Sequence, residues 1–269
     1  MTDRSADELN DLARERFGPR ADGYRESALH TAGPDLELLV ELAATGPDTR
    51  VLDVATGGGH VALALARTGA DVTACDLTPE MLDVAGILLA EHGCQARFVV
   101  AEASALPFDD ASFDVVTCRI AAHHFPDAQV FFAEVARVLV PGGRLAFQDQ
   151  ILPPQPTSAV LVDAFERLRD PSHNQAFSVD GWTTLITRAG LEVERAELID
   201  KRHEFAEWTT RQACDDACVV RLQELMAEAP GGMRDWLVPE YDGERLVAFR
   251  NRHLVALARK PGWAPRDGE

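Results

Sequence analysis

A glycine-rich turn is the first feature of the sequence with residue types and spacing suited to chemistry. It reads Val51-Leu52-Asp53-Val54-Ala55-Thr56-Gly57-Gly58-Gly59-His60, an apolar run that leads through glycines into a helical pattern. Glycines at such a turn let the backbone approach a ligand closely, where a Cβ atom would intervene. The spacing Gly57-x-Gly59-x-x-Ala62 also fits the dinucleotide-binding fingerprint, and a tight turn without a ligand is the alternative.

An acidic residue, Asp76, closes the next strand-like run, 17 positions after Gly59. A carboxylate at that place can accept hydrogen bonds from both hydroxyls of a ribose. Asp76 also precedes Thr78-Pro79, so the alternative is a charge at the start of the following helix. Together, the turn and Asp76 favour a nucleotide-containing cofactor.

Three further stretches separate the candidate cofactors. They are Ala101-Glu102-Ala103-Ser104-Ala105-Leu106-Pro107-Phe108, then Ser112-Phe113-Asp114-Val115-Val116, then Leu139-Val140-Pro141-Gly142-Gly143-Arg144-Leu145. With the two preceding motifs they resemble the class I S-adenosylmethionine-dependent methyltransferases, in particular the type 11 group of ubiquinone and menaquinone C-methyltransferases. The resemblance covers about residues 17–152, with its motifs in the expected order. A nicotinamide-dependent oxidoreductase would leave the motifs Glu102–Phe108 and Leu139–Leu145 unexplained.

The resemblance implies transfer of the methyl group of S-adenosylmethionine to an oxygen, nitrogen or carbon of a small-molecule acceptor, with S-adenosylhomocysteine as product. A protein of this fold that binds the cofactor for a non-methylating activity is the alternative. By resemblance, residues at the glycine turn would contact the methionine end of the cofactor, Asp76 the ribose, and Leu77, Glu102 and Ala103 the adenine. The complete set implied to bind the cofactor is Tyr24, Asp53, Ala55, Gly57, Gly59, Asp76, Leu77, Met81, Glu102, Ala103 and Arg119. Ala55 stands where the family has a glycine, and Glu102 where it has an aspartate.

Two adjacent histidines, His123 and His124, follow the fourth predicted strand and are the candidate catalytic residues. Either could act as a general base or orient the acceptor. We expect the positioning role, because methyl transfer depends more on alignment than on proton transfer. His173 and Asn174 are expected either to face the substrate or to form a structural corner. No histidine or cysteine spacing predicts a metal site.

The elements that position these residues alternate between strands and helices. Strands are predicted at 50–55, 71–75, 96–100, 113–118 and 143–150, and helices at 61–67, 79–92 and 128–140. This alternation predicts a doubly wound α/β fold with a mostly parallel, seven-stranded sheet and helices on both faces. Ligands of such sheets bind beyond the carboxyl ends of the strands.

Four segments are predicted along the chain. Residues 1–45 form an N-terminal helical lid, 46–152 the Rossmann-like cofactor-binding core, 153–260 the rest of the sheet, and 261–269 a tail. Within the third segment we expect a helix at 179–189 with Ser178 as its N-cap, strands at 191–199 and 254–258, and one long helix at 204–229. Insertions at about 151–177 and 201–249, too small for a core of their own, would form a helical cap. Phe177, Trp182, Trp208 and Met226 would line an acceptor pocket or belong to the core.

Composition limits the classes of function. The 269 residues include 44 acidic and 26 basic ones, for a formal net charge of -18, which argues against nucleic acid as a partner. No apolar run is long enough to span a membrane, and the first 20 residues lack the apolar region of a signal peptide. Five scattered cysteines fit a reducing compartment, so a cytoplasmic location is expected. The oligomeric state, homodimer included, is left open.

Overall fold

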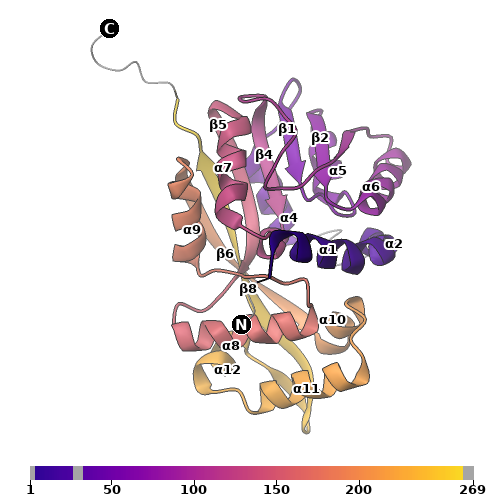
Figure 1. The fold of residues 1–269 in the computed structure, drawn as a ribbon, viewed down its shortest axis with the longest axis vertical. Helices are drawn as coiled ribbons and strands as arrows, with labels where there is room; N and C mark the ends of the chain where they lie inside the picture. The colour runs from indigo at the N-terminus through magenta and orange to yellow at the C-terminus, as the bar shows by residue number, and fades with distance from the viewer. Residues whose placement is uncertain (1–3, 27–32, 263–269) are drawn as a thin grey trace, which may run out of the picture.

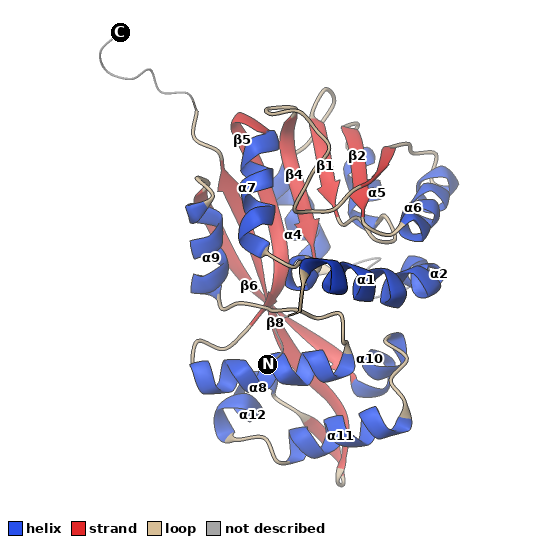
Figure 2. Cartoon of the chain, in the orientation of Figure 1, coloured by secondary structure: helices blue, strands red, loops and turns tan. Residues whose placement is uncertain are grey.

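The computed structural model describes residues 4–26 and 33–262, which form a central sheet with helices on both faces and a helical cap at one edge (Figures 1 and 2). The strands lie in the order β3-β2-β1-β4-β5-β8-β6, and the three-residue β7 pairs with β8. β1 to β5 are parallel, whereas β8 is antiparallel to β5 and β6. The predicted doubly wound, mostly parallel sheet is confirmed, with β7 as an additional short strand. The strands are β1 (Arg50–Val54), β2 (Asp71–Asp76), β3 (Arg97–Val100), β4 (Phe113–Arg119), β5 (Leu139–Ile151), β6 (Glu192–Glu204), β7 (Glu240–Asp242) and β8 (Arg245–Arg259).

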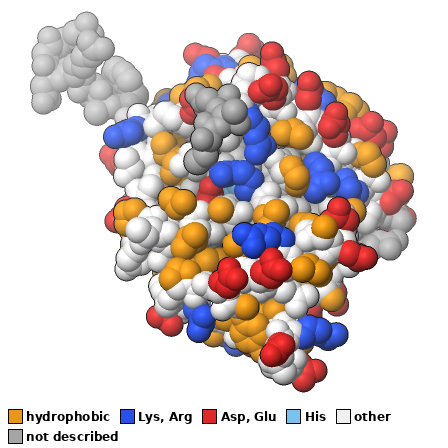
Figure 3. All heavy atoms as spheres, turned by 60° about the horizontal axis from the view of Figure 1, so that its bottom comes forward, with side chains coloured by type: hydrophobic (Ala, Val, Ile, Leu, Met, Phe, Trp, Pro, Cys, Tyr) orange, Lys and Arg blue, Asp and Glu red, His pale blue; other side chains and the backbone are white. Residues whose placement is uncertain are grey.

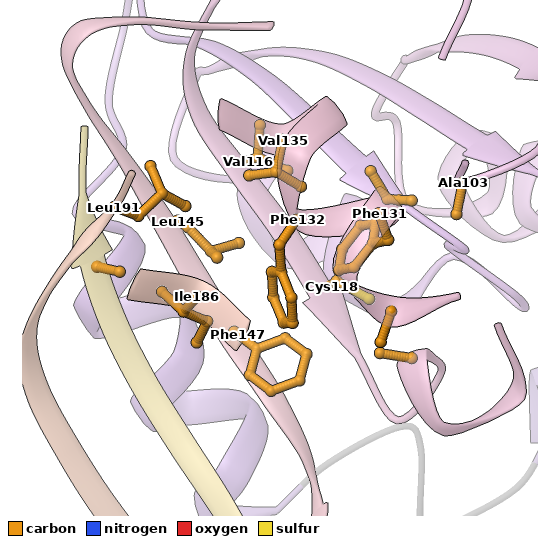
Figure 4. Packing of buried hydrophobic residues seen from close by; sticks show 14 of the residues in the cluster. Ala103, Val116, Cys118, Phe131, Phe132, Val135, Leu145, Phe147, Ile186 and Leu191 are labelled. Carbon is orange, nitrogen blue, oxygen red and sulfur yellow. The ribbon is translucent and has the colours of Figure 1, made fainter. Parts of the chain in front are cut away.

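Apolar side chains on the two faces of the sheet hold separate layers of helices. One face is covered by α4 (Pro34–Ala43), α5 (His60–Ala66) and α6 (Pro79–Glu91). The other is covered by α7 (Ala128–Val138) and α9 (Val179–Arg188). Figure 4 shows Phe131 and Phe132 of α7 directed at the sheet, with Phe147 of β5 beside them. These layers fix the strands whose ends carry the site.

The cap differs in two ways from the prediction. The expected helix at 204–229 is wrong: β6 continues to Glu204, and α10 (Phe205–Arg211) and α11 (Asp216–Ala227) follow as separate helices. The cap also has a buried apolar cluster of its own, to which α8 (Pro156–Arg169), α12 (Gly231–Leu237) and β8 contribute. This cluster can form because β6 and β8 extend beyond the ends of the parallel strands and stay paired as far as Glu204 and Ala248, where the cap packs on them.

The aromatic residues considered for an acceptor pocket are mainly core residues. Trp182 is fully buried between the sheet and α9, with Phe177 packed against it. Trp208 and Met226 belong to the buried cluster of the cap. Ser178 caps α9 as predicted, since its hydroxyl accepts a hydrogen bond from the backbone of Gly181.

The N-terminal segment lies across the carboxyl edge of the sheet, between the sheet and the cap (Figure 1). It contains α1 (Ala6–Phe17), a short 3-10 turn (Gly18–Arg20) and α2 (Ala21–Glu26). α1 begins with a capping box in which the Ser5 hydroxyl and the Glu8 carboxylate each accept a backbone N–H of the other residue. Among the helices that the structure describes, none combines the length and the apolar character needed to cross a membrane.

Candidate active site

A cavity of about 1090 Å³ opens at the carboxyl ends of β1, β2 and β4, under α1. Asn10, Ala13 and Phe17 of α1 line it from above. Most of the residues predicted to bind a cofactor line this cavity: Asp53, Ala55, Gly57, Asp76, Leu77, Met81, Glu102, Ala103 and Arg119. The structure therefore brings together motifs that are spread over nearly 70 positions of the chain.

Gly57 and Gly59 of the glycine turn have different roles. Both have positive φ, 52° and 85°. A Cβ added to Gly57 would meet no protein atom within 4 Å, so open space lies beside this backbone. A Cβ on Gly59 would lie 2.7 Å from the Cβ of Ala85, so Gly59 allows the turn to pack closely against α6. Gly59 is not among the residues that line the cavity, and its contact with the methionine end stays a prediction.

Asp76 ends β2 and holds the local backbone. Its carboxylate accepts hydrogen bonds of 2.9 Å from the backbone N–H groups of Gly57 and Thr78. Burial raises the pKa of Asp76. Because Thr78 is the N-cap of α6, Asp76 does serve the start of this helix, and it also lines the cavity.

Asp53 is fully buried at the end of β1, where its Oδ1 accepts a 2.7 Å hydrogen bond from the Thr117 hydroxyl. Burial raises the pKa of Asp53 to about 6. Its Oδ2 has no hydrogen-bond partner among the described residues. A buried carboxylate oxygen in this state is suited to a hydrogen-bond donor of a ligand.

Two predicted residues have contacts that the sequence did not indicate. Arg119 forms an ion pair of 2.7 Å with the buried Asp35 of α4, and Lys201 of β6 reaches the same carboxylate oxygen at 2.7 Å. Burial lowers the pKa of Lys201 to about 8. Glu102 accepts a hydrogen bond from the Ser104 hydroxyl. The Tyr24 side chain lies outside the described part of the structure.

A second cavity, of about 620 Å³, lies between the first one and the cap. Phe17, Ile120 and His124 line both cavities, so the two adjoin at these residues. Most of its other lining residues are polar: His123, Gln150, Glu166, Arg169, Asp170, His173, His203, Arg211, Gln212, Asn251 and His253, together with Trp208. His123, His173 and Trp208 were considered from the sequence, and the other residues of this list were not predicted.

The adjacent histidines have opposite environments. His123 lines only the second cavity, and its Nδ1 lies 2.6 Å from Oδ1 of Asp149 at the end of β5. Burial opposes a charge on this ring, but the carboxylate of Asp149 outweighs it and raises the pKa of His123. His124 is bonded through Nδ1 to the Ser172 carbonyl at 3.1 Å, and burial together with His123 lowers its pKa to about 3.

His173 and Asn174 lie in the loop between α8 and α9 and differ in their surroundings. His173 lines the second cavity, and its Nε2 lies 2.7 Å from Oδ1 of Asp163. Asn174 donates a 2.9 Å hydrogen bond to the Phe125 carbonyl, which makes it a structural corner. Within residues 4–26 and 33–262, no three His, Cys, Asp or Glu side chains are arranged to hold a metal ion.

Comparisons with known proteins give the family. The family described as a methyltransferase domain matches residues 52–147. The protein named uncharacterized methyltransferase YcgJ, from Bacillus subtilis, is 36% identical over 196 residues, which are 72% of this chain and 78% of that protein. A crystal structure from Bacillus halodurans C-125, assigned as a methyltransferase, has a TM-score of 0.82 at 35% identity and covers 85% of this chain and 100% of its own.

The same fold occurs with another reaction. The cyclase SpnF has a TM-score of 0.63 at 17% identity, covering 96% of this chain and 97% of its own, so the fold alone does not specify chemistry. The sequence motifs and the relatives above 30% identity are more specific than the fold. On these grounds the chain belongs to the class I S-adenosylmethionine-dependent methyltransferases.

Proposed function

We propose that this protein transfers the methyl group of S-adenosylmethionine to a small-molecule acceptor, with the cofactor in the first cavity and the acceptor in the second. The observation that carries this proposal is the meeting of the two cavities at Phe17, Ile120 and His124. When bound, the cofactor supplies an electrophilic methyl group on a positively charged sulfur. In-line displacement needs alignment of nucleophile and methyl group and exclusion of water, and two adjoining cavities under one helix suit both requirements.

The first cavity fits the cofactor in the chemistry of its lining. Asp76 would accept hydrogen bonds from the ribose hydroxyls, and Glu102 would accept one from the adenine amino group. The open space beside Gly57 would admit the methionine part, and the unpartnered Oδ2 of Asp53 would accept one of its donors. The ion pair with Asp35 would fix the position of Arg119 in the lining of this cavity.

His123 would take the proton that the acceptor loses. Its Nδ1 bond to Asp149 leaves Nε2 as the atom that accepts a proton, and the orientation of the ring is fixed by that bond. This proposal departs from the positioning role expected from the sequence, because the sequence did not reveal Asp149 as a partner. His124, kept neutral by its lowered pKa, would line the passage between the cavities without repelling a sulfonium.

The cofactor assignment can be tested by calorimetry. We expect S-adenosylhomocysteine to bind and NAD not to bind comparably. Asp76→Ala should remove two charge-assisted hydrogen bonds, each worth about 1.5–3 kcal/mol, and should therefore weaken binding by at least about tenfold. Asp71→Ala, at the exposed amino end of the same strand, is the matched control and should bind normally.

Two results would contradict this assignment. Tight binding of NAD without binding of S-adenosylhomocysteine would refute the cofactor. Unchanged affinity in Asp76→Ala would mean that the ribose lies elsewhere.

A further inference from the structure

We propose that the second cavity binds a compact acceptor that carries O–H or N–H groups and is methylated on its oxygen or nitrogen. This inference rests on the proposed function, because it concerns the acceptor of that methyl transfer. At about 620 Å³, this cavity is smaller than the first one, which has about 1090 Å³. Its lining then decides what kind of molecule fits.

Most residues of that lining are of polar or charged types. Of its 15 residues, only Phe17, Ile120 and Trp208 are predominantly apolar. Gln150, Glu166, His203 and several others are less than 9% exposed. An apolar acceptor would exclude water from any polar atom of this lining that has no protein partner, and burial of such an atom without a hydrogen bond is unfavourable. A site built in this way discriminates strongly against an analogue that lacks hydrogen-bonding groups.

Two buried atoms of the lining lack a hydrogen-bond partner among the described residues, Oε1 of Glu166 and Nδ1 of His203. Nε2 of His203 lies 2.7 Å from Oδ1 of Asn251, so Nε2 carries the proton and Nδ1 is left as an acceptor. A carboxylate oxygen is an acceptor as well. Both atoms therefore call for donor groups on the ligand.

The charges of the lining balance in number. Glu166 and Asp170 are acidic, and Arg169 and Arg211 are basic. An anion or a cation would gain little from this arrangement, whereas a neutral compound with several donors would match it.

An O–H or N–H acceptor also completes the proton balance. A lone pair of its oxygen or nitrogen forms the bond to the methyl carbon, and the electrons of the broken carbon–sulfur bond stay on sulfur, which becomes a neutral thioether. The released proton passes to Nε2 of His123, whose ring is held by the 2.6 Å contact with Asp149. No oxidant, reductant or metal is needed.

The test uses three isosteric probes with the full chain saturated with S-adenosylhomocysteine. Catechol and ortho-aminophenol carry donors on adjacent ring positions, and ortho-xylene carries methyl groups there. With isotope-labelled histidine, we expect the first two to shift the imidazole resonances of His123 and His203 at millimolar concentration. Ortho-xylene should leave these resonances in place.

Variants of Glu166 test whether its carboxylate, and not only the polar character of the whole cavity, is needed to bind the probe. Glu166→Leu should weaken catechol binding at least tenfold, and Glu166→Gln, which keeps a carbonyl acceptor, should restore most of it. Glu207→Leu, an exposed position on α10, is the matched control and should bind like the parent.

The inference is overturned if ortho-xylene binds as tightly as catechol, if none of the probes shifts these histidines, or if Glu166→Leu binds catechol normally. Failure of the proposed function has a different signature. In that case calorimetry shows no binding of S-adenosylhomocysteine, whatever the probes do.

Discussion

His123 and His124 show at the scale of single residues how neighbours in sequence can acquire different chemistry. The Asp149 carboxylate raises the pKa of His123, whereas burial lowers that of His124. Their ring centroids are 4.1 Å apart, so a proton on one ring disfavours a proton on the other. The pair therefore divides into one ring suited to hold a proton and one that stays neutral.

Removal of the Asp149 charge should reveal this division. We expect Asp149→Asn to lower the pKa of His123 by at least about one unit, equivalent to about 1.36 kcal/mol. Other titratable groups near His123 remain in the variant: His124, Glu166, Asp170, His173 and His253. An NMR titration of the imidazole resonances measures the change. Asp163→Asn, which removes the carboxylate bonded to His173, is the control and should leave the pKa of His123 close to its value in the parent protein.

The effect of Asp149→Asn on the free energy of unfolding should depend on pH in a defined direction. Because the folded pKa of His123 is raised, its ion pair stabilises fully below the unfolded value of about 6.5 and less as pH rises through the folded value. The free energy of unfolding lost in Asp149→Asn should therefore be larger at about pH 6 than at about pH 9. A constant loss across this range, with an unchanged His123 pKa, would show that Asp149 acts only through its backbone contacts.

Local motifs made part of the site predictable, and long-range pairing hid the rest. Asp53 and Asp76 each lie at the carboxyl end of a strand, so their place at the edge of the sheet follows from chain order. Asp149, Glu166 and His203 come from β5, α8 and β6, and meet only after the cap has folded. No spacing rule connects them, although the polar run at the end of the buried β5 was a signal that could have been used.

At the scale of elements, α1 connects the two cavities. Its buried face supplies Asn10 and Ala13 to the first cavity, and Phe17, at its end, contacts both. Phe17 also meets the ring of His124 edge-on, with centroids 5.0 Å apart. Ordered α1 should therefore be needed for tight cofactor binding, which agrees with the proposed role of this segment as a lid.

Two proline substitutions test α1 without changing any residue that lines a cavity. Asp11→Pro, on the exposed face, should cost the helix about 3 kcal/mol because proline removes a hydrogen bond and clashes with the preceding turn. Ala6→Pro is the control, since Ala6 is the first helical residue and the extended Ser5 before it tolerates a proline. We expect S-adenosylhomocysteine to bind at least tenfold more weakly to Asp11→Pro and normally to Ala6→Pro, measured by calorimetry. Equal affinities would exclude α1 from the binding site.

The cap shows where sequence patterns fail for whole elements. The amphipathic stretch from Phe205 to Ala227 has helical periodicity on both sides of its break, so periodicity alone joins α10 and α11. The long β8 was underestimated because its first half is interrupted by charged residues, which suit the partly exposed extension beyond the sheet. These errors affect the acceptor side of the site and not the cofactor side.

Acidic and basic side chains are intermixed on the cap side of the molecule (Figure 3). On the face in Figure 3, basic side chains lie among acidic and apolar ones. With a net charge of -18, long-range attraction to a polyanion is absent. That nucleic acid is not a partner stays a prediction, and the polar second cavity is in keeping with a small acceptor.

The stability of the whole molecule should carry the cost of the buried Asp53. Its pKa is raised from 3.8 to about 6, so the folded protein loses stability as pH rises through about 6, by up to about 3 kcal/mol. We expect Asp53→Asn, without cofactor, to have a higher free energy of unfolding than the parent at about pH 8, and a smaller advantage at about pH 5. Urea denaturation at both values measures this, with the exposed Asp71→Asn as control.

The same substitution should weaken binding of S-adenosylhomocysteine, because the oxygen without a protein partner is the one proposed to meet the cofactor. A gain in stability together with a loss of affinity would identify Asp53 as a residue held at an energetic cost for function. If Asp53→Asn is less stable than the parent at both pH values, the hydrogen bond from Thr117 outweighs the buried charge, and Asp53 is then chiefly a structural residue.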